Sequence, residues 1–311
     1  MGRLQAALRK AVKRDSLSCM IDPSIKLIAI VGPTASGKSD LALELATKHR
    51  GEILCADSRT VYRGLDIGAA KPSAADRAAV PHHLLDLVNP DQVLSVAEFK
   101  RLAETATAEV AERGNIPFLV GGSGLYIDSV LYDYQFPSEA DPMLRAELEL
   151  LTTDQLLERL KIARSAALET IDIANRRRII RAIETAGQPV SRASAMRANT
   201  LVIGITLNKE VMQNRITQRI EKMLSQGLLN EVKSLGELYG WDCEAMSGVG
   251  YRAFKEAILD TKTIDEAAQE CARGDLRLVK KQLTWFKRNK NIHWVQNHAE
   301  AEELTTSFLT T

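Results

Sequence analysis

The segment from Gly32 to Ser39 has the residue types needed to hold a chain of phosphates. It reads GPTASGKS and fits the pattern G-x-x-x-x-G-K-[ST]. Glycines let backbone N–H groups converge on phosphate oxygens, and the amino end of the following helix adds partial positive charge. Lys38 would reach phosphate oxygens, and the Ser39 hydroxyl would face Mg²⁺. The pattern predicts a diphosphate or triphosphate site made of Gly32, Pro33, Thr34, Ala35, Ser36, Gly37, Lys38 and Ser39.

A carboxylate stands at the end of the next apolar run, ILCAD, which closes at Asp57. Open α/β sheets place their sites at the carboxyl ends of parallel strands, so Asp57 can bind Mg²⁺ through water or act as a general base. An aspartate that caps a turn is the alternative. His82 and His83 follow nearby, but adjacent side chains point apart, so we expect hydrogen bonding there and not a shared metal.

Short apolar runs alternate with helical patterns and predict the elements that position these residues. Strands are expected at 26–31, 52–57, 116–120 and 201–207, and helices at 39–49, 93–113 and 209–238. This alternation is typical of a parallel sheet with right-handed crossovers. We therefore expect an α/β fold, with a P-loop NTPase-like parallel sheet flanked by helices. The predicted domains are a basic arm at 1–25, a core at 26–137 and 200–311, and an inserted all-helical domain at 138–199.

The composition is that of an ordinary globular protein. The 311 residues are 45% hydrophobic and 26% charged, with a net charge of +1. No apolar run approaches the length of a membrane span. Four scattered cysteines argue against a zinc site or a disulfide framework, and indicate a reducing compartment. The basic first 20 residues suit a transit peptide, a solvated helix or an arm near RNA. Our expectation is a cytoplasmic monomer.

Beyond the P-loop, a series of motifs from residue 26 to residue 295 resembles the tRNA dimethylallyltransferase (isopentenyltransferase) family. The motifs are GPTASGKSDLALELA, DSRTVYRGLDIGAAKP, PHHLLD, LVGGSGLY, RIIRAIE, RITQRIEKMLSQGLLNEVKSL, GVGYR and KKQLTWFKRNKNIHWV. The departures are Thr60 where members often have Gln, Ser123 where they have Thr, and 172–174 (Asp-Ile-Ala) where many read His-Pro-Asn.

The resemblance implies transfer of a dimethylallyl group from dimethylallyl diphosphate to N6 of the adenine 3′-adjacent to the anticodon in tRNA. It implies that the P-loop holds the diphosphate of that donor, with Mg²⁺ as cofactor. Asp57 would be the general base and Arg219 would contact the leaving diphosphate, with Lys38 and Ser39 completing the catalytic set. The positions that match tRNA contacts are Asp57, Ser58, Arg59, Thr60, Ser123, Arg145, Arg177, Arg178 and Arg181.

Three other functions stay open at this point. A P-loop small-molecule kinase would share the cradle and an acid after the second strand. An adenylate isopentenyltransferase would run the same chemistry on a free nucleotide. A non-catalytic RNA-binding protein could use the same scaffold. Near the C-terminus, VKKQLTWFKRNK interleaves basic and aromatic residues, and we expect at least one of Trp285 and Phe286 to be core.

Overall fold

The computed structural model describes residues 21–137, 141–164, 168, 171–185 and 190–311. All but the last five residues of the predicted basic arm, 1–25, lie outside this part. The chain forms two compact units. The first comprises the described residues up to Leu131 together with those from Met196 onward, and the second is Tyr132–Ala195.

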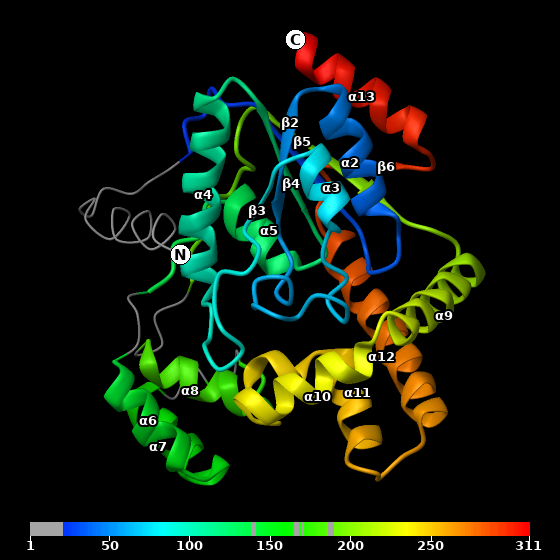
Figure 1. Ribbon diagram of the computed structural model, residues 1–311. Helices are drawn as coiled ribbons and strands as arrows, with labels where there is room; N and C mark the ends of the chain where they lie inside the picture. Colours follow the sequence, from blue (N-terminus) through cyan, green and yellow to red (C-terminus); the bar gives the residue numbers. More distant parts are fainter. Residues whose placement is uncertain (1–20, 138–140, 165–167, 169–170, 186–189) are drawn as a thin grey trace. The chain divides into compact units, whose positions relative to one another are not determined.

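A parallel sheet lies at the centre of the first unit, as predicted (Figure 1). Its strands are ordered β3-β2-β4-β1-β5-β6, and every neighbouring pair is parallel. The P-loop strand β1 is therefore central, between β4 and β5. The strands are β1 (Leu27–Val31), β2 (Gly51–Cys55), β3 (His82–His83), β4 (Ile116–Gly121), β5 (Thr200–Ile205) and β6 (Ile292–Val295).

Helices cover both faces of the sheet (Figure 1). Leu41 and Leu45 of α2, with Ala301 of α13, join the sheet residues in one apolar core. Helices α4 and α5 cover the other face, where Phe99 stacks on Tyr126 at 3.9 Å between ring centroids. The helices of this unit are α2 (Lys38–Lys48), α3 (Ala74–Ala79), α4 (Val96–Glu112), α5 (Gly124–Leu131), α9 (Lys209–Ser225), α10 (Leu228–Tyr239), η2 (Glu244–Ser247), α11 (Val249–Ile258), α12 (Ile264–Phe286) and α13 (His298–Thr310).

The second unit is helical and has a core of its own. Its helices are α6 (Pro142–Leu150), α7 (Thr153–Arg164) and α8 (Arg176–Glu184). Leucines from α6 and α7 pack against isoleucines from α8, namely Leu148, Leu156, Leu160, Ile179, Ile180 and Ile183. The unit begins and ends a few residues before the predicted limits at 138 and 199.

The structure corrects the predicted elements in two places. The helix expected at 209–238 is two helices, because Gly227 takes a left-handed conformation (φ 98°) that ends α9 and starts α10. The short edge strands β3 and β6 were not predicted, since two and four residues give too little alternation to read. Within the described residues, no helix combines the length and apolarity needed to cross a membrane.

Candidate active site

The P-loop connects β1 to α2, as the sequence predicts. Its turn uses positive φ at Ala35 (59°) and Gly37 (91°). Gly32 must lack a side chain, because a Cβ there would lie 2.5 Å from the carbonyl oxygen of Ile205 on β5. The loop is thereby pressed against the carboxyl end of the sheet, where its backbone N–H groups can face an anion.

Two features of this loop suit a bound anion. Lys38 donates to the Pro33 carbonyl at 3.2 Å across the loop, and burial lowers the pKa of its ammonium to about 8. Asp57 opposes that pKa shift, and the positive charge of Arg219 adds to it. The Ser36 hydroxyl is buried and has no hydrogen-bond partner in the described part of the chain. An unsatisfied buried hydroxyl is costly, and a bound phosphate oxygen would satisfy it.

Arg219 reaches the P-loop from α9. Its Nη1 donates to the Thr34 hydroxyl, and it lies 4.0 Å from the Asp275 carboxylate on α12. Burial raises the pKa of Asp275, while the guanidinium lowers it. The buried Nε of Arg219 has no partner among the described residues. The guanidinium thus lies at the P-loop, and its Nε–H is still able to donate a hydrogen bond.

Asp57 follows β2 at the same edge of the sheet. Its carboxylate accepts the Arg59 N–H at 2.8 Å, and its carbonyl accepts the Thr60 hydroxyl at 3.3 Å. The neighbouring Ser58 N–H donates to the Ser123 hydroxyl at 2.9 Å. The structure therefore brings the 57–60 segment and Ser123 together. Asp57 is also near enough to the P-loop for its negative charge to raise the pKa of Lys38.

The carboxyl end of β4 packs directly against the residue that precedes this segment. A Cβ on Gly121 would lie 1.9 Å from the Ala56 carbonyl oxygen, so only glycine fits there. Arg59 donates to the Glu244 carbonyl at 2.8 Å and lies 3.7 Å from its carboxylate. The predicted tRNA contact Arg59 is therefore engaged with the protein itself in this structure.

The loop that carries Asp57 is held by a carboxylate that the sequence analysis did not single out. Glu231 on α10 accepts three consecutive backbone N–H groups, those of 66–68, at 2.7–2.9 Å. The Tyr251 hydroxyl donates to the same carboxylate at 2.7 Å. At the end of this loop the buried Lys71 donates to Asp66 and Asp86. These contacts fix the loop around the general-base candidate.

The predicted arginines of the inserted domain lie together in the second unit. Arg145 on α6 and Arg181 on α8 both pair with Glu184, at 2.9 and 3.4 Å. Arg178 lies 4.0 Å from Asp172, and Arg177 is its neighbour on α8. Because α8 buries its isoleucines, these basic side chains share its other side.

The part of the chain that the structure describes offers few metal ligands. Ser39 is exposed at the start of α2, and no group of three or more His, Cys, Asp or Glu residues in the described ranges could hold a metal ion. His83 bonds to Glu52 at 2.6 Å and His82 to the Val80 carbonyl at 2.7 Å, which agrees with the predicted hydrogen-bonding role. This donor set fits Mg²⁺, which keeps several waters and binds through substrate phosphates.

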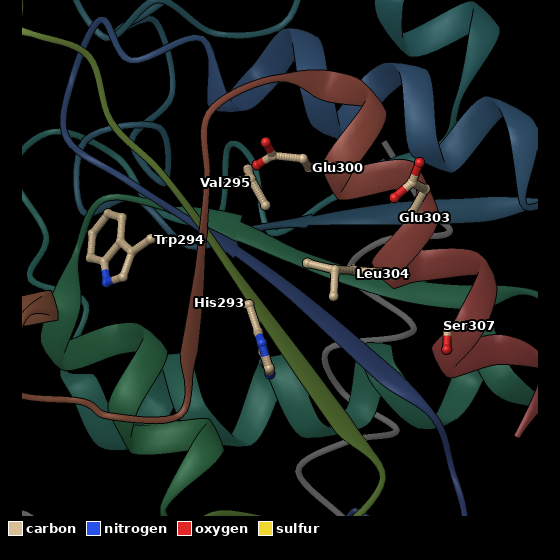
Figure 2. Close-up of a pocket in the computed structure, with 7 residues that line it drawn as sticks. All are labelled: His293, Trp294, Val295, Glu300, Glu303, Leu304 and Ser307. Atoms are coloured by element: carbon tan, nitrogen blue, oxygen red, sulfur yellow. The ribbon is translucent and has the colours of Figure 1, made fainter.

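A separate cavity lies between β6 and α13 (Figure 2). None of the predicted site residues lines it. Its lining residues are His293, Trp294, Val295, Glu300, Glu303, Leu304 and Ser307.

Known proteins resemble this chain over most of its length. A family model described as IPP transferase matches residues 60–289. The chain belongs to this family. A tRNA dimethylallyltransferase of Roseiflexus sp. (strain RS-1) is 44% identical over a 280-residue alignment that covers 86% of this chain and 92% of the relative. A tRNA dimethylallyltransferase of Bacillus pumilus (strain SAFR-032) is 38% identical over a 281-residue alignment that covers 86% of this chain and 88% of the relative.

Solved structures share the fold. The full-length tRNA isopentenylpyrophosphate transferase of Bacillus halodurans is 35% identical, with a TM-score of 0.70, and the match covers 92% of this chain and 96% of that one. A eukaryotic dimethylallyltransferase has a TM-score of 0.76 at 22% identity, over 88% of this chain and 74% of that one, which shows the common fold.

Proposed function

We propose that this chain transfers a dimethylallyl group from dimethylallyl diphosphate to N6 of the adenine 3′-adjacent to the anticodon in tRNA. The products are N6-isopentenyladenosine and diphosphate. The observation that carries the proposal is an arginine hydrogen-bonded into a phosphate cradle beside a strand-end carboxylate, in a chain of the IPP transferase family. The relatives named tRNA dimethylallyltransferase support the same activity.

The proposed reaction is a direct displacement. The N6–C bond forms as the C–O bond to diphosphate breaks, and the electron pair of that bond leaves with the diphosphate. The adenine amine is a weak nucleophile, so its proton passes to the Asp57 carboxylate as the new bond forms. Holding the amine and the allylic carbon in line supplies a further part of the rate enhancement.

Positive charge meets the leaving group from two directions. The P-loop amides and Lys38 face it from the sheet, and Arg219 faces it from α9. These groups are already in place before negative charge develops, so they stabilise the transition state without reorganisation. The Ser36 hydroxyl adds a further donor to the cradle.

Mg²⁺ is part of the proposal. The Ser39 hydroxyl would be its protein ligand, with diphosphate oxygens and water as the others. When bound, the ion would neutralise charge on the diphosphate.

The tRNA would be bound through both units. In the first unit we assign contacts to Asp57, Ser58, Arg59, Thr60 and Ser123, which lie together around the general base. In the second unit the assigned contacts are Arg145, Arg177, Arg178 and Arg181, whose guanidiniums suit phosphates. The adenine must leave its stack to reach Asp57, and a loop nucleotide does so at lower cost than a paired one.

The decisive experiment measures modified nucleosides. The purified chain is incubated with dimethylallyl diphosphate, Mg²⁺ and bulk tRNA, and the tRNA is digested for mass spectrometry. We expect adenosine carrying one dimethylallyl group, and none in a tRNA with another base 3′ of the anticodon. Robust phosphorylation from ATP without tRNA would establish a kinase, equal use of AMP an adenylate isopentenyltransferase, and tRNA binding without transfer a non-catalytic protein.

The monomeric state and the cytoplasmic location belong to the same proposal. Light scattering on the purified chain, alone and with a tRNA, tests the first. Fractionation of cells that express the full chain tests the second.

A further inference from the structure

Gln282 on α12 spans the two turns that build the candidate site. Its Oε1 accepts the Thr34 N–H at 2.9 Å, and its Nε2 donates to the Gly122 carbonyl at 3.0 Å. Thr34 lies in the P-loop and Gly122 in the turn after β4, 248 and 160 residues away along the chain. One side-chain amide thus joins the phosphate cradle to the turn that carries Ser123.

The packing around this amide fixes its position. A Cβ on Gly122 would lie 2.5 Å from the Gln282 Nε2 and 3.2 Å from the Gly32 carbonyl oxygen. Only glycine at 122 lets the β4 turn, the P-loop and the glutamine meet so closely. The two hydrogen bonds use both ends of the amide.

Trp285, about one helical turn further along α12, contacts the residues that follow Ser123 in the chain. Its Nε1 donates to Asp128 at 2.8 Å, and its ring lies where a Cβ on Gly124 would be 2.3 Å from its Cδ1. Gln282 and Trp285 therefore pack against Gly122 and Gly124, the two residues that flank Ser123. The Ser123 hydroxyl in turn accepts the Ser58 N–H, next to Asp57.

The same helix also holds the arginine of the cradle. Asp275, about two turns before Gln282, lies 4.0 Å from Arg219, which donates to the Thr34 hydroxyl. Thr34 is thus held at its amide by Gln282 and at its hydroxyl by Arg219. The Thr34 N–H is already used, and the Ser36 N–H donates to the Pro33 carbonyl at 3.3 Å, so the amides of 35 and 37–39 are the ones left for phosphate.

We propose that Gln282 is a positioning residue for prenyl transfer. It sets the distance between the P-loop, which holds the leaving group, and the Ser123 turn, which holds the segment of the general base. This inference rests on the proposed function and adds a residue to its machinery. Small errors in that distance are costly, because displacement requires reacting atoms in near contact and in line.

The first test replaces Gln282 with methionine in the full chain. Gln282→Met keeps the length of the side chain and removes both hydrogen bonds. We expect kcat/KM for dimethylallyl diphosphate to fall about 10- to 100-fold, carried mainly by kcat, with the affinity for tRNA unchanged. Affinity for inorganic diphosphate, measured by calorimetry, should also fall. The matched control is Gln269→Met, at an exposed position of the same helix.

The second test uses Gln282→Glu across a range of pH. A neutral carboxylic acid can accept from Thr34 and donate to the Gly122 carbonyl, whereas a carboxylate can do only the first. Burial beside a carbonyl raises a carboxyl pKa. We therefore expect kcat/KM relative to wild type to rise as pH falls from 8 to 6. Lys38, Arg219 and Asp275 are present in both proteins, so the ratio removes the part of the pH profile that the two proteins share.

The outcomes distinguish a failure of the proposed prenyl transfer from a failure of the positioning role of Gln282. Wild-type protein without prenyl transfer refutes the proposed function, and the diphosphate affinities of the variants then decide the positioning role. Wild-type turnover with unchanged kcat/KM in Gln282→Met overturns the positioning role alone. So does a Gln282→Glu ratio that stays constant with pH, as loss of packing would give. Circular dichroism melting checks folding, and if Gln282→Met fails to fold, the pH series decides.

Discussion

The binding of dimethylallyl diphosphate should weaken steeply above pH 8. Burial lowers the pKa of Lys38 to about 8, and only the ammonium form attracts the diphosphate. Roughly nine-tenths of the lysine is charged at pH 7 and roughly 3% at pH 9.5. If binding requires the charged form, the dissociation constant rises roughly 30-fold over this range, which is about 2 kcal/mol.

The sign follows from linkage. The diphosphate raises the pKa of Lys38 in the complex, so binding takes up a proton at high pH and loses a factor of about ten per pH unit above 8. Calorimetric titration at constant ionic strength and saturating Mg²⁺ measures the constant at each pH. The control is Lys38→Arg, whose guanidinium stays charged throughout.

The control decides the result because ionisation of the ligand affects both proteins equally. We expect the affinity of Lys38→Arg to change little between pH 7 and 9.5, while that of the wild type falls. Parallel curves for the two proteins would show that Lys38 does not titrate in this range, and the account of its buried ammonium would be wrong.

Four further outcomes follow from the same site and core. Asp57→Asn should lower kcat by about 100-fold or more with tRNA affinity kept, and a small change in a quench-flow assay would remove it as general base. Arg219→Gln should lower kcat/KM for dimethylallyl diphosphate by about 100-fold; unaltered steady-state kinetics would contradict its role at the leaving group. Chelation of Mg²⁺ should abolish turnover and its return should restore it, whereas activity that persists in chelator would exclude the metal at Ser39. Arg113, Asn115 and His83 hold the pKa of Glu52 at about 2, below its ordinary 4.5, so the carboxylate stabilises the fold above about pH 4.5 and loses this effect as pH falls toward 2. Glu52→Gln should therefore lower the free energy of unfolding by roughly 3 kcal/mol at pH 7, and a gap from wild type that does not narrow below pH 4.5 in denaturant titrations would refute this.

The parts of the fold that the sequence predicted are those encoded locally. The P-loop, β1 and α2 follow one another within 27–48, so their glycines, lysine and apolar periodicity are read in one window. Phe286, expected as a candidate core residue, is buried, while Trp285 gives its N–H to Asp128. The edge strands β3 and β6 pair through only a few residues, and their pairing depends on neighbours already in the sheet.

The residues that sequence reasoning missed are the ones that hold others in place. Glu231, Asp275 and Gln282 stand on helices whose periodicity marks them only as polar positions. The backbone partners of Glu231 and both partners of Gln282 lie 160 or more residues away, so no local spacing marks these contacts. The glycines of GGSG were a signal, because a Cβ on Gly122 would clash with Gln282 and a Cβ on Gly124 would clash with Trp285. Sequence alone identifies the glycines but not what approaches them.

The central place of β1 also has a consequence for how the protein is made. Leu27 pairs with Thr200, so β1 waits after synthesis for a neighbour that is made on the order of ten to thirty seconds later. During that delay the second unit, with its own apolar cluster, can already bury its side chains. The P-loop of the growing chain lacks its hydrogen bond to Gln282 until α12 has been synthesised. A stalled or prematurely ended chain would therefore carry the phosphate-binding motif but no assembled catalytic centre.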